Sequence, residues 1–324
     1  MSVTNLSDSG YHYSHTLGID LYDGRGFRDP VDVALGPDGT VYVLQRGTPF
    51  HQNTLIKKCT IDEEFLEEFG AYGTGPGQWV WPACLIMDAE QRLYVSDEWN
   101  NRISIFDSQG YLLDEWGRAG CDAGQLFRPC GIALDHEMNL LVVDAGNHRV
   151  QRFTASGEFI SGWGGPGSEE GRFNMPWGVA VGPEGEIYVS DWRNDRVQKF
   201  TSQGEFLLQW GTSGSDDGQF NRPAGLAVDA DGGVYVVDWH NNRVQIFDPA
   251  GNFRTKLLGN ATVSTWGEEQ LANFPEMVEE RRVAKDLNLE KLFSNPRGIK
   301  VDDQGRVFVV DCARGRIQIY RKEL

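Results

Sequence analysis

The chain contains Pro129-Cys130-Gly131-Ile132-Ala133-Leu134-Asp135, the first of three close copies of one short sequence. The other two are Pro176-Trp177-Gly178-Val179-Ala180-Val181 and Pro223-Ala224-Gly225-Leu226-Ala227-Val228-Asp229. A looser copy begins at Pro82, so the opening prolines stand at 82, 129, 176 and 223, each 47 residues after the last. A unit of this length cannot bury its apolar faces alone, so neighbouring units must stack. The spacing therefore predicts one closed array of equivalent units.

Each unit contains four short segments in which apolar and polar residues alternate. In the unit that opens at Pro129 these segments are 131–135, 140–144, 149–154 and 158–163. Turn residues separate them, as in Gly182-Pro183-Glu184-Gly185, where glycine supplies a positive φ. Four antiparallel strands in a unit of this length are typical of one blade of a β-propeller.

A second signature links the second and third strands of each unit. It reads Asp144-Ala145-Gly146-Asn147-His148-Arg149-Val150-Gln151, and related copies start at Asp97, Asp191, Asp238 and Asp311. The pattern D-x-x-N-x-R-(I/V)-Q, with P-x-G ahead of the first strand, resembles the NHL repeat family. The resemblance covers almost the whole chain, and it implies an all-β propeller.

The count of units predicts six blades. First strands are expected near Pro30, Pro82, Pro129, Pro176, Pro223 and Pro296. The last unit stops after its third strand, so the segment 11–18 is expected to supply the missing strand and close the ring, which removes unpaired edges. We therefore expect an all-β, six-bladed β-propeller of four-stranded antiparallel blades as a single domain over residues 1–324. One short helical insertion, 260–293, is expected to lie over the loop face.

The composition limits the classes of partner. The formal net charge is −17, which disfavours nucleic acid and anionic membranes because their phosphates are repelled. The N-terminal residues lack an apolar signal core, and no apolar run approaches the length of a membrane span. Five cysteines without a C-x-x-C pair form neither a disulfide framework nor a zinc-knuckle spacing. We expect a cytoplasmic, acidic protein.

The repeated aspartates and arginines are interpreted as structural. A residue that is needed once for chemistry has no reason to appear in five blades. An aspartate at a strand end can accept N–H groups of a turn, and an arginine can bond carboxylates or carbonyls between blades.

Six tryptophans remain that the repeat does not require. Of these, Trp81, Trp99, Trp177, Trp192 and Trp239 lie beside the opening prolines or just after the repeated aspartates; the sixth is Trp266. In a four-stranded blade both loops emerge on one face, so the first five should crowd one end of the ring. A longer loop around Arg46 should lie there as well.

Aromatic walls with a few convergent polar groups are typical of a ligand pocket. The predicted ligand-binding residues at this end are Asp32, Arg46, Trp81, Trp99, Trp177, Trp192, Trp239 and Arg297. The alternative that some of these tryptophans only plug the channel stays open.

We favour a binding module that takes a small molecule or a peptide at this end of the central channel; a protein partner is also left open. The alternative is an enzyme, a lyase, isomerase or hydrolase, with His240, Glu98 and Arg193 as its catalytic residues. Catalytic motifs such as G-x-S-x-G and H-E-x-x-H are absent from the sequence.

No cofactor is predicted, and the sequence leaves open a calcium ion in the channel. The resemblance would place the zinc-binding histidines of a peptide-amidating lyase at the openings of the first strands. No histidine stands at the matching positions here, so no metal-binding residue is predicted.

Overall fold

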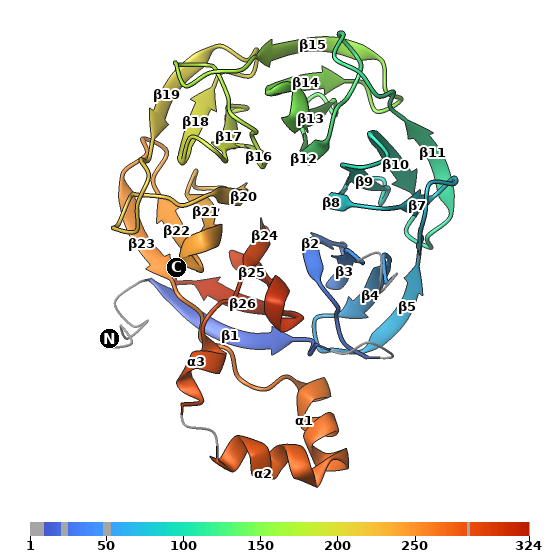
Figure 1. Cartoon of the computed structure of the whole chain (residues 1–324), viewed down its shortest axis with the longest axis vertical. Coiled ribbons are helices and arrows are strands. Elements are labelled where there is room, and N and C mark those ends of the chain that lie inside the picture. The colour runs from blue at the N-terminus through green and yellow to red at the C-terminus, as the bar shows by residue number, and fades with distance from the viewer. Residues whose placement is uncertain (1–9, 21–24, 48–52, 284–285, 324) are drawn as a thin grey trace.

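The computed structural model describes residues 10–20, 25–47, 53–283 and 286–323. In these residues six antiparallel sheets of four strands each surround a central axis, as Figure 1 shows. The six-bladed propeller predicted from the repeat is confirmed.

Blades 1 to 3 follow the chain order. Their strands are β2 Pro30–Leu35, β3 Thr40–Gln45, β4 Ile56–Thr60 and β5 Phe65–Phe69; β8 Pro82–Met87, β9 Leu93–Asp97, β10 Arg102–Phe106 and β11 Leu112–Trp116; β12 Pro129–Leu134, β13 Leu140–Asp144, β14 Arg149–Phe153 and β15 Phe159–Gly164. A short parallel pair, β6 Ala71–Tyr72 with β7 Gln78–Trp79, lies in the connection between blades 1 and 2.

Blades 4 to 6 complete the ring. Their strands are β16 Val179–Val181, β17 Ile187–Asp191, β18 Arg196–Phe200 and β19 Phe206–Trp210; β20 Pro223–Val228, β21 Val234–Asp238, β22 Arg243–Phe247 and β23 Phe253–Leu257; β24 Pro296–Val301, β25 Arg306–Asp311, β26 Arg316–Lys322 and β1 Tyr11–Leu17.

The N-terminal strand closes the ring, as the sequence predicts. Strand β1 pairs antiparallel with β26, with Tyr11 opposite Lys322 and Leu17 opposite Ile317. The Tyr11 hydroxyl also lies 2.8 Å from the hydroxyl of Tyr235 in blade 5. Both ends of the chain are therefore held in one sheet.

The core consists of apolar clusters between neighbouring blades. Leu44 and Ile56 of blade 1, for example, share a buried cluster with Leu93 and Phe106 of blade 2. Alternating strand residues reach these clusters on both faces of a blade, which explains why the second strands are buried over their whole length.

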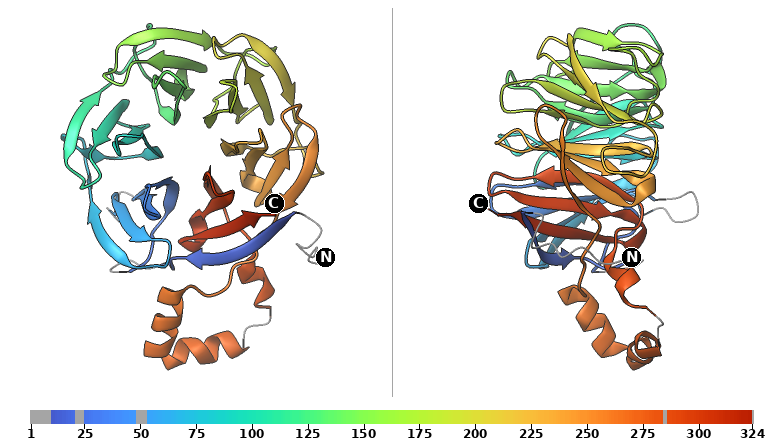
Figure 2. Two further views of the ribbon diagram at one scale, coloured as in Figure 1. Left: turned by 180° about the vertical axis from the view of Figure 1, so that it is seen from behind. Right: turned by 90° about the vertical axis from the view of Figure 1, so that its left-hand side faces the viewer.

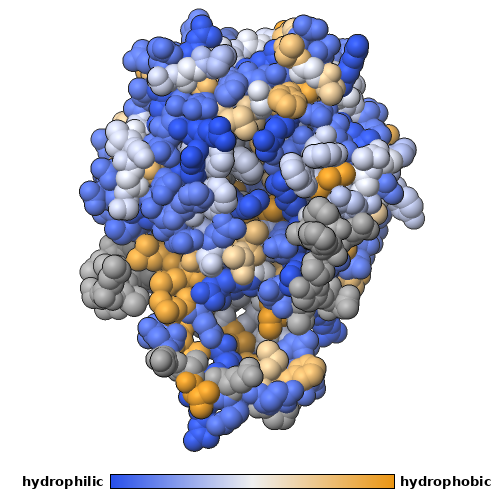
Figure 3. Space-filling view, viewed as in Figure 1, coloured by the Kyte–Doolittle hydropathy of each residue, from blue (hydrophilic) through white to orange (hydrophobic). Residues whose placement is uncertain are grey.

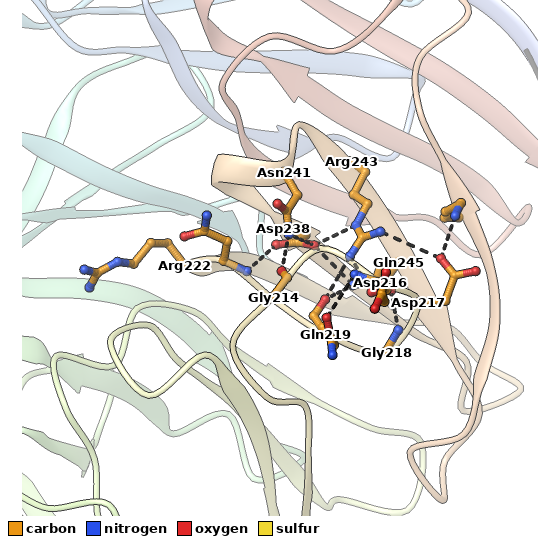
Figure 4. A network of polar contacts seen from close by, with 12 residues as sticks. Gly214, Asp216, Asp217, Gly218, Gln219, Arg222, Asp238, Asn241, Arg243 and Gln245 are labelled. Carbon is orange, nitrogen blue, oxygen red and sulfur yellow. Dashed lines mark hydrogen bonds and ion pairs between the residues drawn. The ribbon is translucent and has the colours of Figure 1, made fainter. Parts of the chain in front are cut away.

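A buried carboxylate organises one end of blades 2 to 6, as Figure 4 shows for blade 5; in blade 1 the second strand ends at Gln45 instead. Oxygen Oδ2 of Asp238 accepts hydrogen bonds from Asn241 Nδ2 at 2.9 Å, Arg243 Nε at 2.7 Å and Gln245 Nε2 at 3.2 Å. Arg243 Nη2 donates in turn to the carbonyl oxygen of Gln219, in the loop that leads into the blade, at 2.9 Å. Related carboxylate networks stand at Asp97, Asp144, Asp191 and Asp311. These networks bear out the structural interpretation of the repeated signature.

The insertion lies elsewhere than expected. Its helices α1 Thr265–Asn273, α2 Pro275–Val283 and α3 Asn288–Lys291 project outward from the rim beside blade 6, away from the central opening, in the views of Figures 1 and 2. Trp266 is buried against Phe27, with ring centroids 5.7 Å apart, and its backbone N–H donates to Glu63. The prediction that this segment covers the loop face is wrong, because its anchor is the junction of blades 6 and 1.

Hydrophobic surface gathers on the insertion and the adjoining rim in the view of Figure 3, while the rest of that face is mainly hydrophilic. Phe274, Val278 and Leu289 are among the exposed large apolar side chains there.

Replacing Asp238 by alanine should destabilise the propeller severely. The change leaves the buried guanidinium of Arg243 without its carboxylate, and breaking a buried pair typically costs about 3–5 kcal/mol. Thermal and urea unfolding of D238A would measure the loss.

The matched control is Asp231→Ala. Asp231 forms an exposed ion pair with Lys322, and exposed pairs contribute about 0–1 kcal/mol. Equal losses in both variants would contradict a structural role for the repeated carboxylate.

Candidate functional site

Two kinds of loop meet at one end of the ring, because first and second strands are antiparallel neighbours. In five of the six blades the first residue of the first strand pairs with the last residue of the second, as Pro82 does with Asp97 and Pro223 with Asp238. In blade 4 the first strand begins later, with Val179 opposite Val189. We call this end the tryptophan face. It carries five tryptophans: Trp81, Trp99, Trp177, Trp192 and Trp239.

Blade 2 supplies one pair of these indoles. Asp97 Oδ1 accepts the backbone N–H groups of Trp81, at 3.1 Å, and of Trp99, at 2.9 Å. The two rings meet edge to face with centroids 5.1 Å apart, and the Arg46 guanidinium lies 5.1 Å from the Trp81 ring centroid. Trp99 remains 55% exposed. The repeated aspartate therefore holds both indoles in place.

Blades 4 and 5 supply a row of three indoles. The ring centroid of Trp192 lies 5.9 Å from that of Trp177 and 5.9 Å from that of Trp239. The Trp192 ring stacks on Trp239 with 28° between the ring planes. The Trp239 Nε1–H donates to the side-chain oxygen of Asn295 in blade 6. All three indoles are partly exposed. The row forms a flat apolar ledge beside the channel.

Arginines cover this ledge. The guanidinium carbons of Arg193 and Arg222 lie 5.5 and 4.7 Å from the Trp192 ring centroid, and that of Arg297 lies 5.4 Å from the Trp239 ring. These are cation–π distances. In the described part of the chain no carboxylate lies within ion-pair distance of these three guanidiniums. Arg222 was not among the residues that the sequence singled out.

The proposed acid of the enzyme hypothesis is already paired. The Glu98 side chain is 1% exposed, and its two oxygens bind Arg46 at 2.9 Å and Arg128 at 2.7 Å. His240, by contrast, is exposed in blade 5, where its ring lies 4.3 Å from that of Trp239. Glu98 stands in blade 2, and Arg193 stands in blade 4. Arg193 and His240 thus flank the same indole row, whereas Glu98 belongs to a separate ion-pair cluster.

Asp32 lies inside the channel, below the tryptophan face. It stands where other blades have glycine, and its Oδ2 accepts the backbone N–H of Leu85 in the next blade at 2.9 Å. Lys300 Nζ lies 3.6 Å from the same oxygen. A cavity of about 30 Å³ adjoins Asp32, Cys84 and Lys300 and is also lined by Trp177 and Arg297. A space of this size suits a water molecule rather than an aromatic ring.

A larger cavity opens at the opposite end of the channel. It measures about 950 Å³ and is walled by the far halves of the first strands, with small residues such as Ala133, Ala180 and Ala227. Acidic residues at its edge are partly neutralised: Asp88 binds Arg92, and Asp302 binds Arg306, each at 2.6 Å. The sequence signal for this cavity is the alanine repeated near the end of each first strand.

Within the described residues no group of three or more His, Cys, Asp or Glu side chains is placed to hold a metal ion. None of the described helices is long and apolar enough to span a membrane. In the extended loop near Arg46, residues 48–52 lie outside the described residues.

The comparisons with known proteins agree with the fold. The NHL repeat family matches residues 173–200, 220–247 and 293–320. No curated protein matches the chain.

Solved structures of similar fold share little sequence. A streptogramin B lyase is 13% identical, with a TM-score of 0.61 over 96% of this chain and 97% of that one. A virginiamycin B lyase from Staphylococcus aureus, solved with quinupristin, is 14% identical, with a TM-score of 0.59 over 97% and 89% of the two chains. An auxiliary nutrient binding protein from Bacteroides thetaiotaomicron is 13% identical, with a TM-score of 0.64 over 97% and 76%.

The cysteines of the channel wall should resist alkylation in the folded protein. Burial raises the pKa of Cys84 to about 12 and that of Cys130 well above its ordinary value. The thiolate is the reacting species, so iodoacetamide in mildly alkaline buffer should modify exposed Cys121 first. Peptide mass spectrometry would measure this order, and urea-unfolded protein should be modified at all five positions. Labelling of Cys84 as fast as Cys121 would contradict the burial of the Cys84 thiol.

Proposed function

We propose that this chain, which is an NHL-repeat β-propeller, binds a small molecule or a peptide at its tryptophan face. The observation that carries the proposal is the row formed by Trp177, Trp192 and Trp239. Its three indoles are partly exposed, and arginines lie over Trp192 and Trp239. Aromatic side chains bury large areas on binding and are enriched, with arginine, among residues that dominate binding energy.

Packing alone is a poor explanation for this row. Trp177 and Trp239 do pack in part against buried apolar clusters. The row also stacks ring on ring, however, and arginines lie over two of its rings, which core packing does not require. If these indoles only filled the end of the channel, their exposed apolar surface would remain in contact with water, which is unfavourable. The arginines beside them would also keep no ion-pair partner among the described residues.

The tryptophan face is a better candidate than the larger cavity at the other pole. That cavity has a largely polar lining, with Asp38, Asp303 and Lys300 beside small aliphatic residues, and Phe308 is the one aromatic residue among its described lining residues, so it offers no flat aromatic surface. The tryptophan face combines flat apolar surface with hydrogen-bond donors, which is the usual composition of a specific site.

The enzyme alternative is not carried forward as a proposal. Proteins of the same fold include a lyase and a nutrient-binding protein, so the fold is compatible with catalysis and with binding. The Glu98 carboxylate is occupied by two arginines, however, and a general acid must reach its substrate.

Removing two indoles of the row should weaken binding. We expect the double variant Trp192→Ala, Trp239→Ala to lose at least about tenfold in affinity, or about 1.4 kcal/mol, for ligands found in a screen of metabolites and short peptides. Isothermal titration calorimetry would measure the affinities, and circular dichroism would verify the fold.

Two control variants separate this site from the rest of the molecule. Trp116→Phe removes an indole from the outer strand β11, and Asp303→Asn changes the edge of the opposite cavity. Both should bind like the unaltered protein. The proposal fails if the double variant keeps its affinity for every ligand that the screen finds.

A further inference from the structure

We infer that the ligand of the tryptophan face is an oxyanion on a flat apolar body, such as an aromatic carboxylate or an aromatic phosphate ester. This inference rests on the proposed function, and it adds the chemical class of the ligand.

The charge at this face is opposite to that of the whole chain. The chain carries a net charge of −17, yet five arginines lie at this one end: Arg46, Arg128, Arg193, Arg222 and Arg297. Glu98 is shared by Arg46 and Arg128, which leaves that group with one excess positive charge. The other three arginines have no ion-pair partner among the described residues. The face is therefore locally cationic.

Arg193 and Arg222 approach the same indole. Their guanidinium carbons lie 5.5 and 4.7 Å from the Trp192 ring centroid. Two like charges held around one ring repel each other, and an anion bound between them would remove that repulsion. Asp195, two residues after Arg193, uses its Oδ1 to accept the backbone N–H of Arg222 at 2.7 Å. Its carboxylate thus fixes the backbone and leaves the guanidinium available.

The backbone holds Arg222 in an unusual conformation. Its φ is 62°, a left-handed conformation that is uncommon for a residue other than glycine, and Pro223 follows it directly. Arg128 precedes Pro129 with φ 55° and is held in the same way, by a hydrogen bond of 2.8 Å from its N–H to Asn101 Oδ1. Such conformations persist only where the surroundings impose them. The backbone of both arginines is therefore fixed before a ligand binds, which lowers the conformational entropy lost on binding.

Arg297 offers a donor that is not yet used. Its Nε is buried and has no acceptor among the described residues, while its guanidinium lies over Trp239. Because Nε is buried, an oxyanion on the ledge would reach Arg297 through the Nη groups of its guanidinium, which has no ion-pair partner among the described residues.

These features together define the ligand class. A guanidinium binds a carboxylate or a phosphate through two parallel hydrogen bonds, and an indole stacks on a flat ring. A cationic ligand would be repelled. A long polyanion such as RNA would meet the negative field of the remaining surface, so a small anion is the better match.

The test compares three ligands that share one flat body: naphthoate, naphthyl phosphate and the neutral naphthamide. Isothermal titration calorimetry should show naphthoate or naphthyl phosphate binding at least about tenfold more tightly than naphthamide. The tighter of the two anions identifies the oxyanion that the site prefers. The double variant Arg193→Gln, Arg222→Gln should lose this preference while it still binds naphthamide.

The control for net charge is the double variant Arg254→Gln, Arg321→Gln. Both residues are exposed on other strands, so the change in total charge is the same, and the preference should persist. Equal affinity for all three ligands, still dependent on Trp192 and Trp239, would overturn the inference and leave the proposed function standing. Binding that ignores both tryptophans would instead overturn the proposed function.

Two further outcomes would also overturn the inference. One is the failure of both anions to bind at millimolar concentration. The other is tighter binding of a single-stranded oligouridylate than of either anion, which would point to nucleic acid.

Discussion

The buried aspartate at the end of the second strand is the interaction on which the rest of the molecule depends. Asp238 collects the side chains of Asn241, Arg243 and Gln245, and through Arg243 it fixes the loop that enters the blade. In blade 2 the corresponding Asp97 also accepts the N–H groups of Trp81 and Trp99. One repeated carboxylate thus stabilises blades 2 to 6 and sets the backbone of the tryptophan face. Because the carboxylate binds backbone groups there, the side chains of that face can differ from blade to blade.

Much of the fold could be predicted because every blade must satisfy the same constraints. A constant spacing between opening prolines and aspartates predicts the number of blades, and the missing last strand predicts closure by the N-terminal segment. The same phase argument predicts that five tryptophans share one face. The direction of the insertion could not be predicted, because an extra length of sequence carries no information about where it packs. Trp266 decides it by its burial against Phe27.

Several features of the candidate site could not be predicted from the sequence, each for a physical reason. The tryptophans divide into a pair in blade 2 and a row in blades 4 and 5, a distinction that depends on side-chain directions. Arg128 and Arg222 precede opening prolines, as Trp81 does, but only the tryptophan was selected at that position because the repeat does not require it. The buried pairing of Glu98 requires Arg128 of the next blade, a contact that spans 30 residues of sequence. A signal was present: both arginines occupy the same position of the repeat.

The two ends of the channel differ in chemistry, and that contrast gives the most direct test. A crystal structure of the protein soaked with naphthoate would show which end binds. The account predicts density for the ring against Trp192 and Trp239, with its carboxylate between Arg193, Arg222 and Arg297. Density in the cavity at the opposite pole, with the indole row unoccupied, would contradict it.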